Sequence, residues 1–180
     1  MKPIKKLGFI ASLLVVLSAC NAFVAKETIF GSGVESVFTY AGANRDLKTE
    51  VIGNPFSAST AVTEKAVTDA MQGSDFGINA HFTTQPSSSA LDFWRVVVLF
   101  NPPKNLPEWE VCGNRGGLTS GAGGNDLHVL MVFCSGDFAE SWVNSSAAAF
   151  TSPNDPRFAN LIGNTAFMLL PSRGQNSDSF

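Results

Sequence analysis

The sequence predicts an α+β fold, a single domain in which a mostly antiparallel sheet is covered on one side by two helices. Three observations support this. The chain has 180 residues, enough for one domain and little more. It is 44% hydrophobic and 15% charged, which is too apolar for a disordered chain and too sparsely charged for a coiled coil. Its apolar patterns follow the order strand, strand, helix, four strands, helix.

The first two strands are expected at residues 35–40 and 47–52. Val37, Phe38 and Tyr40 are strand formers and support the first strand. Alternation of apolar and charged residues supports the second strand. Both segments are short, so each is expected to contribute one strand to the sheet.

Residues 58–71 carry the clearest helical pattern, because small and apolar residues recur there at steps of three and four. Ser57, Ser59 or Thr60 can cap the start of this helix, and Gly73 lies where a left-handed C-cap is expected. The residues expected on its buried face are Ala58, Ala61, Val62, Ala66, Val67, Ala70 and Met71.

Four further strands are expected at residues 76–84, 91–100, 127–134 and 138–143. The first alternates and should bury one face, whereas the second is apolar almost throughout and resembles a central strand. The last two meet across the turn-like sequence 135–137, which favours a hairpin. These connections make the sheet mostly antiparallel.

A final helix is expected to begin at Asp155 and Pro156, because Asp is a favoured N-cap and Pro is tolerated at the first helical position. Pro171 should end it, and the polar residues 172–180 form a tail. Its expected buried face consists of Phe158, Leu161, Ile162, Thr165 and Leu169.

The N-terminus has the pattern of an export signal. Three lysines precede the apolar stretch 7–17, which gives way to small residues. As a helix, this stretch rises only ~16 Å, about half the thickness of a bilayer core. A permanent membrane span is therefore not expected.

The sequence Leu17-Ser18-Ala19-Cys20 resembles the lipobox of bacterial lipoproteins. The resemblance implies that the chain is cleaved before Cys20, that the Cys20 thiol receives a diacylglyceryl group, and that the new amino terminus is acylated. Two or three acyl chains anchor a protein stably to a membrane surface. The alternative is ordinary signal cleavage after Ala19, Ala22 or Ala25, with Cys20 incidental.

Asn21 follows the lipobox, where an Asp favours retention at the inner membrane in proteobacterial members of this class. The resemblance therefore implies a lipid anchor in the outer membrane, facing the periplasm. Removal of residues 1–19 takes away three lysines and leaves nine basic against 15 acidic side chains, a net charge of −6. Such an acidic body does not favour nucleic acid or anionic lipid as a partner.

Cysteine use agrees with an oxidising compartment. If Cys20 carries lipid, Cys112 and Cys134 remain as an even pair, and we expect a disulfide between them. Closing a loop of this length stabilises a fold by roughly 3 kcal/mol. The alternative is two buried thiols.

The expected organisation is a signal peptide at residues 1–19, a lipidated tether at 20–34, the α+β domain at 35–171 and a polar tail at 172–180. Within the domain, the segments 45–56, 82–86 and 132–137 resemble a group of uncharacterised proteobacterial lipoproteins. These segments include Arg45-Asp46-Leu47, Gly53-Asn54-Pro55-Phe56, Phe82-Thr83-Thr84-Gln85-Pro86 and Val132-Phe133-Cys134-Ser135-Gly136-Asp137. The resemblance implies no activity.

Residues 113–124 are rich in glycine and include Arg115, so their backbone donors can in principle cradle an anion. The segment lacks the Lys-Ser/Thr ending of a nucleotide-binding loop. We interpret it as a mobile loop held at its base by Cys112 and Cys134.

Metal binding requires several converging ligands, and the chain has only two histidines, His81 and His128. Asp126, His128 and Asp137 can form at most a loose site, so no metal and no cofactor are expected. His128 lies on an apolar strand and is interpreted as a partly buried structural imidazole.

A periplasmic hydrolase using His81 or His128 is an alternative function, although no Gly-x-Ser-x-Gly elbow, Ser-x-x-Lys pair or His-Glu-x-x-His helix is present. The sequence Glu108-Trp109-Glu110 pairs two carboxylates with a ring on which a sugar can stack, but a solvated turn explains it more simply. Catalysis is therefore not the favoured interpretation.

We expect a membrane-anchored lipoprotein that acts as a structural or accessory protein-binding module of the cell envelope. Trp109 is the candidate contact residue, because 15 phenylalanines exceed what so small a core needs and leftover aromatics concentrate at interfaces. In the competing interpretation, all of these rings belong to the core. A small-ligand binding protein that serves a transporter is a further alternative.

Overall fold

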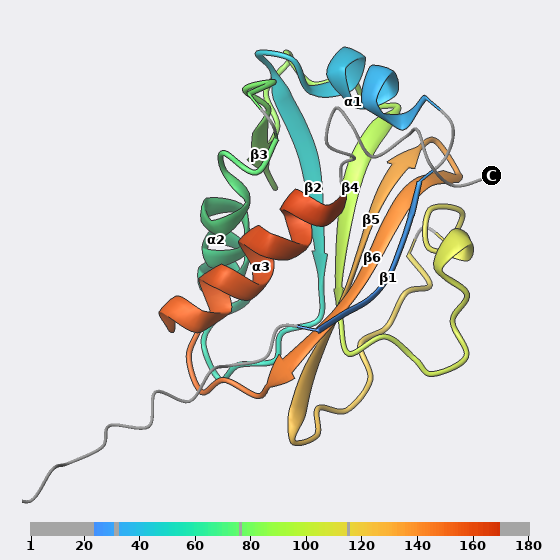
Figure 1. Ribbon diagram of the computed structural model, residues 1–180. Coiled ribbons are helices and arrows are strands. Elements are labelled where there is room, and N and C mark those ends of the chain that lie inside the picture. Colours follow the sequence, from blue (N-terminus) through green and yellow to red (C-terminus); the bar gives the residue numbers. More distant parts are fainter. Residues whose placement is uncertain (1–23, 31–32, 76, 115, 170–180) are drawn as a thin grey trace, which may run out of the picture.

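A six-stranded sheet in the order β1-β6-β5-β4-β2-β3 forms the centre of the computed structural model (Figure 1). The model describes residues 24–30, 33–75, 77–114 and 116–169. The strands are β1 (Val24–Phe30), β2 (Asp46–Ile52), β3 (His81–Thr83), β4 (Trp94–Phe100), β5 (Asp126–Ser135) and β6 (Phe138–Ala148).

Three of the five neighbouring strand pairs are antiparallel, β1 with β6, β6 with β5, and β5 with β4. The pairs β4 with β2 and β2 with β3 are parallel. The expected α+β class with a mostly antiparallel sheet is therefore confirmed. The long hairpin of β5 and β6, which was also expected, turns at Gly136, where φ is 56°.

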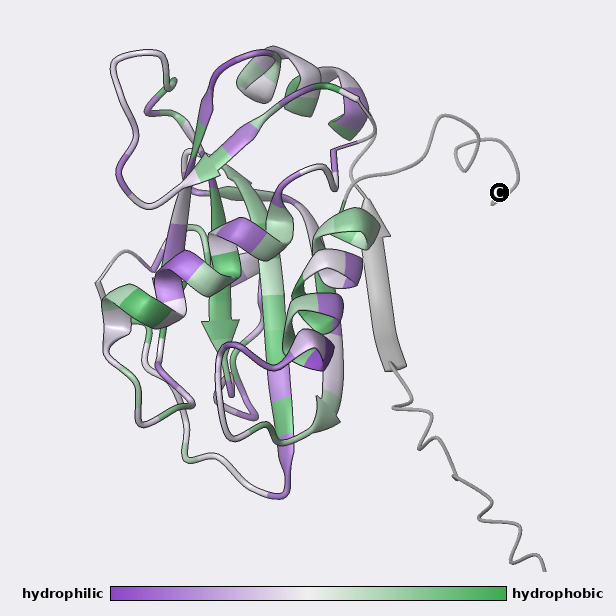
Figure 2. Cartoon of the chain, turned by 90° about the vertical axis from the view of Figure 1, so that its left-hand side faces the viewer, coloured by the Kyte–Doolittle hydropathy of each residue, from purple (hydrophilic) through white to green (hydrophobic). Residues whose placement is uncertain are grey.

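Two helices, α2 (Thr60–Met71) and α3 (Pro156–Leu169), cover one face of the sheet, as expected (Figures 1 and 2). In Figure 2 the central strands are mostly hydrophobic, whereas the helices in front of them alternate between hydrophobic and hydrophilic residues. All five residues expected on the buried face of α3 are buried. Asp155 caps this helix by accepting a hydrogen bond from the backbone N–H of Arg157 at 2.9 Å.

A third helix, α1 (Val34–Gly42), lies across one end of the sheet, where the sequence predicted a strand at residues 35–40 (Figure 1). That prediction is wrong. Val34, Phe38 and Ala41 are buried and follow one another at helical spacing. Burial of this stripe against the sheet outweighs the modest strand preference of the single residues.

The buried face of α2 is rotated relative to the prediction, because Thr63, Val67, Thr68 and Met71 are buried while Val62 is exposed. The threonine hydroxyls find local partners, since that of Thr63 donates to the side-chain oxygen of Asn54 at 2.9 Å. A threonine whose hydroxyl is hydrogen-bonded can therefore occupy the inner face of a helix. Gly73 has the expected positive φ of 75°.

The strand predicted at residues 76–84 is much shorter, since β3 begins only at His81. The carboxylate of Asp75 accepts hydrogen bonds from the N–H groups of Gly77 at 3.2 Å and Ala80 at 2.5 Å. These local bonds hold the chain before β3 in a turn and compete with strand pairing.

The segment 20–34, expected as a tether, contributes β1 to the sheet. Val24 pairs with Ser146 and Phe30 pairs with Ser141 on β6. The tether interpretation therefore does not describe residues 24–30, and the folded part of the chain begins before residue 35. Cys20 and the signal sequence at residues 1–19 lie outside the described residues, as does the tail at 172–180.

Candidate functional site

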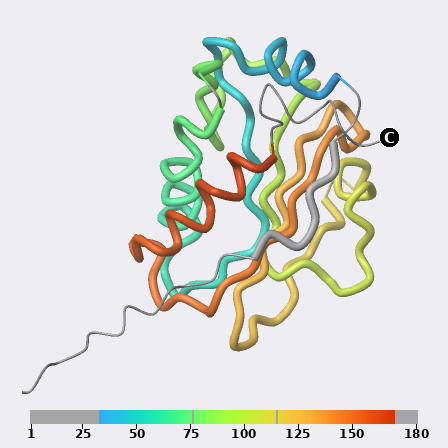
Figure 3. The backbone as a smooth tube through the Cα atoms, viewed as in Figure 1, coloured from blue at the N-terminus to red at the C-terminus, as the bar shows by residue number. Residues whose placement is uncertain are grey.

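Among the described residues, no α-helix lies on the second face of β4, β5 and β6, which is covered by the segment 101–125 (Figure 3). Val111 and Cys112 from this segment pack against Val97 and Leu99 of β4 and against apolar residues of β5. A disulfide joins Cys112 to Cys134, with a Cα–Cα distance of 5.6 Å. The expected pairing is confirmed, and both cysteines are fully buried.

Arg95 is a buried cation at the base of this loop. Its guanidinium donates to the carbonyl of Gly136 at 2.8 Å and to the carbonyl of Cys112 at 2.6 Å. Its Nε lies 3.3 Å from a carboxylate oxygen of Glu50 on β2. Arg95 thus joins Cys112 and the turn between β5 and β6 to the central strand β4.

Asn101 directly follows β4 and has φ of 47°, in the left-handed region that Asn adopts more readily than most residues. Its side-chain oxygen accepts from the N–H of His128 at 3.1 Å, and its own N–H donates to the His128 carbonyl at 2.8 Å. Its carbonyl accepts from the N–H of Gly121 at 2.7 Å. The bend at Asn101 therefore fixes the glycine-rich segment next to the start of β5.

Close packing explains why residue 121 of this segment is a glycine. A Cβ on Gly121 would lie 2.9 Å from the Asn101 carbonyl oxygen, closer than real Cβ contacts. Ser120 donates to the Phe100 carbonyl at 2.7 Å and holds the same strip against the end of β4. Arg115, the residue expected to add charge to an anion cradle, lies outside the described residues.

A groove of about 900 Å³ lies between the segment 101–125 and the adjoining parts of β5 and β6. Lys104, Glu108, Asp126, His128 and Asn144 are among the residues that line it. The Asn144 amide donates to a Glu108 carboxylate oxygen at 2.8 Å and links η1 (Glu108–Glu110), a short 3₁₀ helix, to β6. This bond positions one wall of the groove.

Asp126 and His128 lie two positions apart on β5, so their side chains point to the same face of the strand. His128 is exposed, and its interpretation as a partly buried imidazole is wrong. The reason is that His128 lines the open groove and lies outside the apolar cluster on this face of the sheet. Among the described residues, none bonds to the side chain of Lys104, Asp126 or His128.

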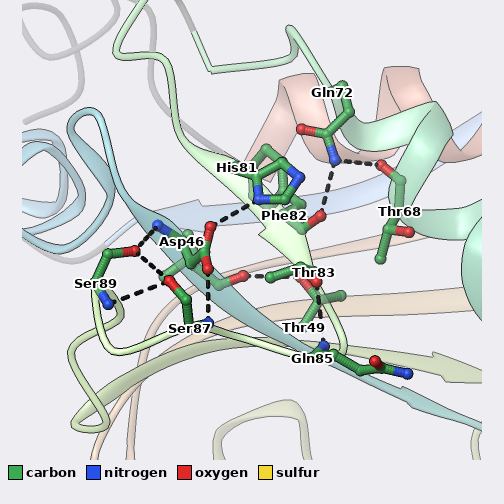
Figure 4. A network of polar contacts seen from close by, with 11 residues as sticks. Asp46, Thr49, Thr68, Gln72, His81, Phe82, Thr83, Gln85, Ser87 and Ser89 are labelled. Atoms are coloured by element: carbon green, nitrogen blue, oxygen red, sulfur yellow. Dashed lines mark hydrogen bonds and ion pairs between the residues drawn. The ribbon is translucent and has the colours of Figure 1, made fainter.

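His81 lies elsewhere, on β3, in a separate polar network (Figure 4). Its Nδ1 is 2.7 Å from a carboxylate oxygen of Asp46, whose other oxygen accepts from the N–H of Ser87 at 2.7 Å. These bonds, the one from Ser87 first, lower the pKa of Asp46 from 3.8 to about 2. The Asp46 N–H in turn donates to the hydroxyl of Ser89 at 3.1 Å.

This network holds a loop and does not resemble a nucleophilic centre. The hydroxyls of Ser87 and Ser89 contact each other at 3.0 Å, and neither bonds to the His81 imidazole within the described structure. In Figure 4 both serines lie beyond Asp46 as seen from the imidazole. A hydrolase would therefore find an imidazole oriented by Asp46 here, but among the described residues no serine hydroxyl is bonded to that imidazole.

The residues considered for a loose metal site are not brought together. Asp126 starts β5, whereas Asp137 lies in the turn between β5 and β6 at the opposite end of the hairpin. In the described part of the chain, no group of three His, Cys, Asp or Glu residues has a suitable arrangement for a metal ion.

Trp109, the predicted contact residue, lies on η1 and is 61% exposed. Of the two carboxylates beside it in the sequence, that of Glu108 accepts a hydrogen bond from Asn144, and Glu110 is exposed.

A cluster of aromatic residues that the sequence did not single out lies at the end of the sheet next to α1. We call the aromatic end the set of Tyr40, Phe93 and Trp94, whose rings are in contact, together with Phe138, which pairs with the β5 partner of Trp94 at the same end of the sheet. Tyr40, Phe93 and Phe138 are 63%, 54% and 76% exposed. The Trp94 ring contacts the rings of Tyr40 and Phe93 at centroid distances of 5.2 and 5.0 Å.

Backbone contacts fix part of this cluster. The Phe93 carbonyl accepts from the N–H of Gly136 at 2.6 Å, and a Cβ on Gly136 would lie 2.7 Å from the Phe93 ring. The sequence signal was the adjacent pair Phe93-Trp94 before an apolar strand and Phe138 directly after a turn. It was not recognised because Tyr40, the fourth ring, is distant in sequence.

Comparison of the chain with protein-family models, curated proteins and solved structures returned no match. Among the helices of the described residues, none combines the length and apolarity needed to cross a bilayer.

Proposed function

We propose that the protein is a bacterial lipoprotein, anchored to the outer membrane through acyl chains on Cys20, whose periplasmic domain binds a protein partner of the cell envelope. The lipobox and the export signal support the anchor. The disulfide supports an oxidising compartment such as the periplasm.

The observation that carries the proposal is the position of the aromatic end relative to the start of β1. β1 begins at Val24 beside Ser146, whereas Phe138 starts β6 at the opposite end of the hairpin. Cys20 precedes Val24 by four residues, a reach of at most ~14 Å. An anchor on Cys20 therefore attaches the domain at one end and leaves the aromatic end directed away from the membrane.

The chemistry of the aromatic end favours a protein partner. Exposed rings that gather on one surface are typical of protein interfaces, where Tyr, Trp and Phe are enriched. A bilayer is the less suitable occupant, because the mature chain carries a net charge of −6 and anionic lipid repels it. We infer a partner with a complementary apolar surface.

The test is in-cell crosslinking on the native membrane, followed by mass spectrometry. Phe138→Ser and Tyr40→Ser should each weaken one specific crosslinked adduct without changing the melting temperature, because both side chains are largely exposed. Val62→Ser on α2 is the matched control, since Val62 is also an exposed apolar residue.

Two outcomes count against this surface. If the double variant Tyr40→Ser/Phe138→Ser keeps every adduct of the wild type, the aromatic end is not the contact surface. If Trp109→Ala alone removes the adduct, the contact lies at η1, where the sequence predicts it.

A further inference from the structure

The groove combines charged groups of both signs that have no bonded neighbours among the described residues. Lys104 supplies an ammonium, Asp126 a carboxylate and His128 an imidazole, and Asn144 adds an amide already held by Glu108. We propose that this groove binds a zwitterionic phosphoester, the chemistry of a phosphoethanolamine lipid headgroup. The membrane as the source of this ligand rests on the lipid anchor of the proposed function.

Charge complementarity favours a zwitterion over a simple ion. A purely anionic ligand would meet the carboxylates of Glu108 and Asp126, and a purely cationic ligand would meet Lys104. A ligand with both charges can accept hydrogen bonds at its phosphate from Lys104 and donate from its ammonium to Asp126. Both charged groups of the ligand are then neutralised within one site.

The size and walls of the groove suit a small organic ligand. Its volume of about 900 Å³ is within the range of small-molecule sites. Leu106 adds apolar surface, which can cover the methylene and glycerol carbons next to a phosphate. The hydrogen bonds at Asn101 and the disulfide at Cys112 fix the covering segment before a ligand arrives.

The groove also lies at the end of the sheet where β1 begins, close in the chain to Cys20. His128 on β5 pairs with Ser146 on β6, and Ser146 pairs with Val24 on β1. Two strand spacings separate His128 from Val24 by about 10 Å. With Cys20 only four residues before Val24, a lipidated protein would hold the groove beside the headgroup layer, at a high effective ligand concentration.

The experiment is a titration of the full mature chain, in a detergent without phosphate, with glycerophosphoethanolamine. Nuclear magnetic resonance shifts of His128 and Asn144 report binding in the groove. We expect saturable binding, with inorganic phosphate, ethanolamine and γ-aminobutyrate each at least about ten-fold weaker. Absence of saturation, or equal binding of phosphate alone, would overturn the proposal.

Variants assign the binding to the groove. Lys104→Met and Asp126→Asn should each weaken binding by about five-fold or more, because each removes one charge-assisted contact. Lys65→Met on α2 and Asp92→Asn before β4 are matched controls outside the groove and should bind like the wild type. If the groove variants behave like these controls, the assignment fails.

A second arm identifies the source of the ligand. The same resonances should shift in nanodiscs of phosphatidylethanolamine and not in nanodiscs of phosphatidylglycerol. Binding of the free headgroup without a shift in phosphatidylethanolamine nanodiscs would overturn a lipid source. The titration itself does not require an anchor, so a chain found without lipid would contradict the proposed function while leaving the headgroup measurement interpretable.

Discussion

The two faces of the sheet are built from the same strands but closed in different ways. Among the described residues, 22 buried apolar side chains form one cluster with α1, α2 and α3 on the helical face, whereas the cluster on the other face has seven, including the two cysteines. β4 contributes to both, with Val96 and Val98 on the first and Val97 and Leu99 on the second. Apolar packing closes one face, and covalent and polar bonds supplement it on the other.

This difference explains where a ligand can enter. On the helical face, interlocking apolar side chains of the described residues fill the space between the helices and the sheet. The opposite face is held at a few points, namely the disulfide, Arg95, Asn101 and the bond from Asn144 to Glu108. Between these points the groove stays open, and the following predictions test this contrast.

Phe158→Ala should have the largest effect on stability, because it removes a ring from the centre of the packed helical face. The Phe158 side chain is fully buried and its ring contacts those of Phe56, Phe100 and Phe150. We expect a loss of about 4 kcal/mol in the free energy of unfolding, measured by urea denaturation. Phe138→Ala, at an exposed ring, is the control and should change stability by less than about 0.5 kcal/mol.

Removing the disulfide should have the next largest effect. The double variant Cys112→Ala/Cys134→Ala should lose about 3 kcal/mol, because the loop it closes is no longer constrained in the unfolded chain. The same variant should expose amides of the segment 101–125 to hydrogen exchange while those of α3 stay protected. Equal exchange in both regions would show that the two faces are not separable.

Arg95→Met should destabilise the protein by about 2 kcal/mol, because it leaves the buried carbonyls of Cys112 and Gly136 without their donor. Arg95→Lys should recover part of this loss, since an ammonium can still reach one carbonyl. Denaturation of both variants is the measurement. A methionine variant as stable as the wild type would mean that the disulfide alone holds the loop.

The smallest expected effect is the pH dependence from Asp46. Its pKa in the folded protein is about 2, below its ordinary value of 3.8, so the ionised carboxylate stabilises the fold above the ordinary value. This contribution should disappear as the pH falls from about 5 to 2. Thermal melts should show Asp46→Asn less stable than the wild type near neutral pH, with a difference that shrinks in acid.

Elements with local signals were predictable from the sequence. The turn at Gly136 and its flanking apolar runs indicated the β5–β6 hairpin, and the Asp155-Pro156 pair with the pattern after it indicated α3. The Cys112–Cys134 bond followed from counting cysteines. In each case the determining residues lie close together in the chain or form the one remaining pair.

Features that depend on distant contacts were not predictable. The sequence 35–40 carries strand formers, and only packing of Val34, Phe38 and Ala41 against the sheet makes it helical. Arg95 appeared as one charge in an apolar run, with no sign of the two carbonyls it joins. The groove required knowledge of where the segment 101–125 crosses β5 and β6.

The lipid on Cys20 determines both the orientation of the aromatic end and the source of the groove ligand. Intact mass spectrometry of the protein purified from native membranes tests it most directly. We expect a chain that begins at Cys20 and carries the mass of diacylglyceryl and acyl groups, and we expect the Cys20→Ser variant to leave the membrane fraction. A lipid-free chain cleaved after Ala19, Ala22 or Ala25 and recovered in the soluble fraction would contradict it.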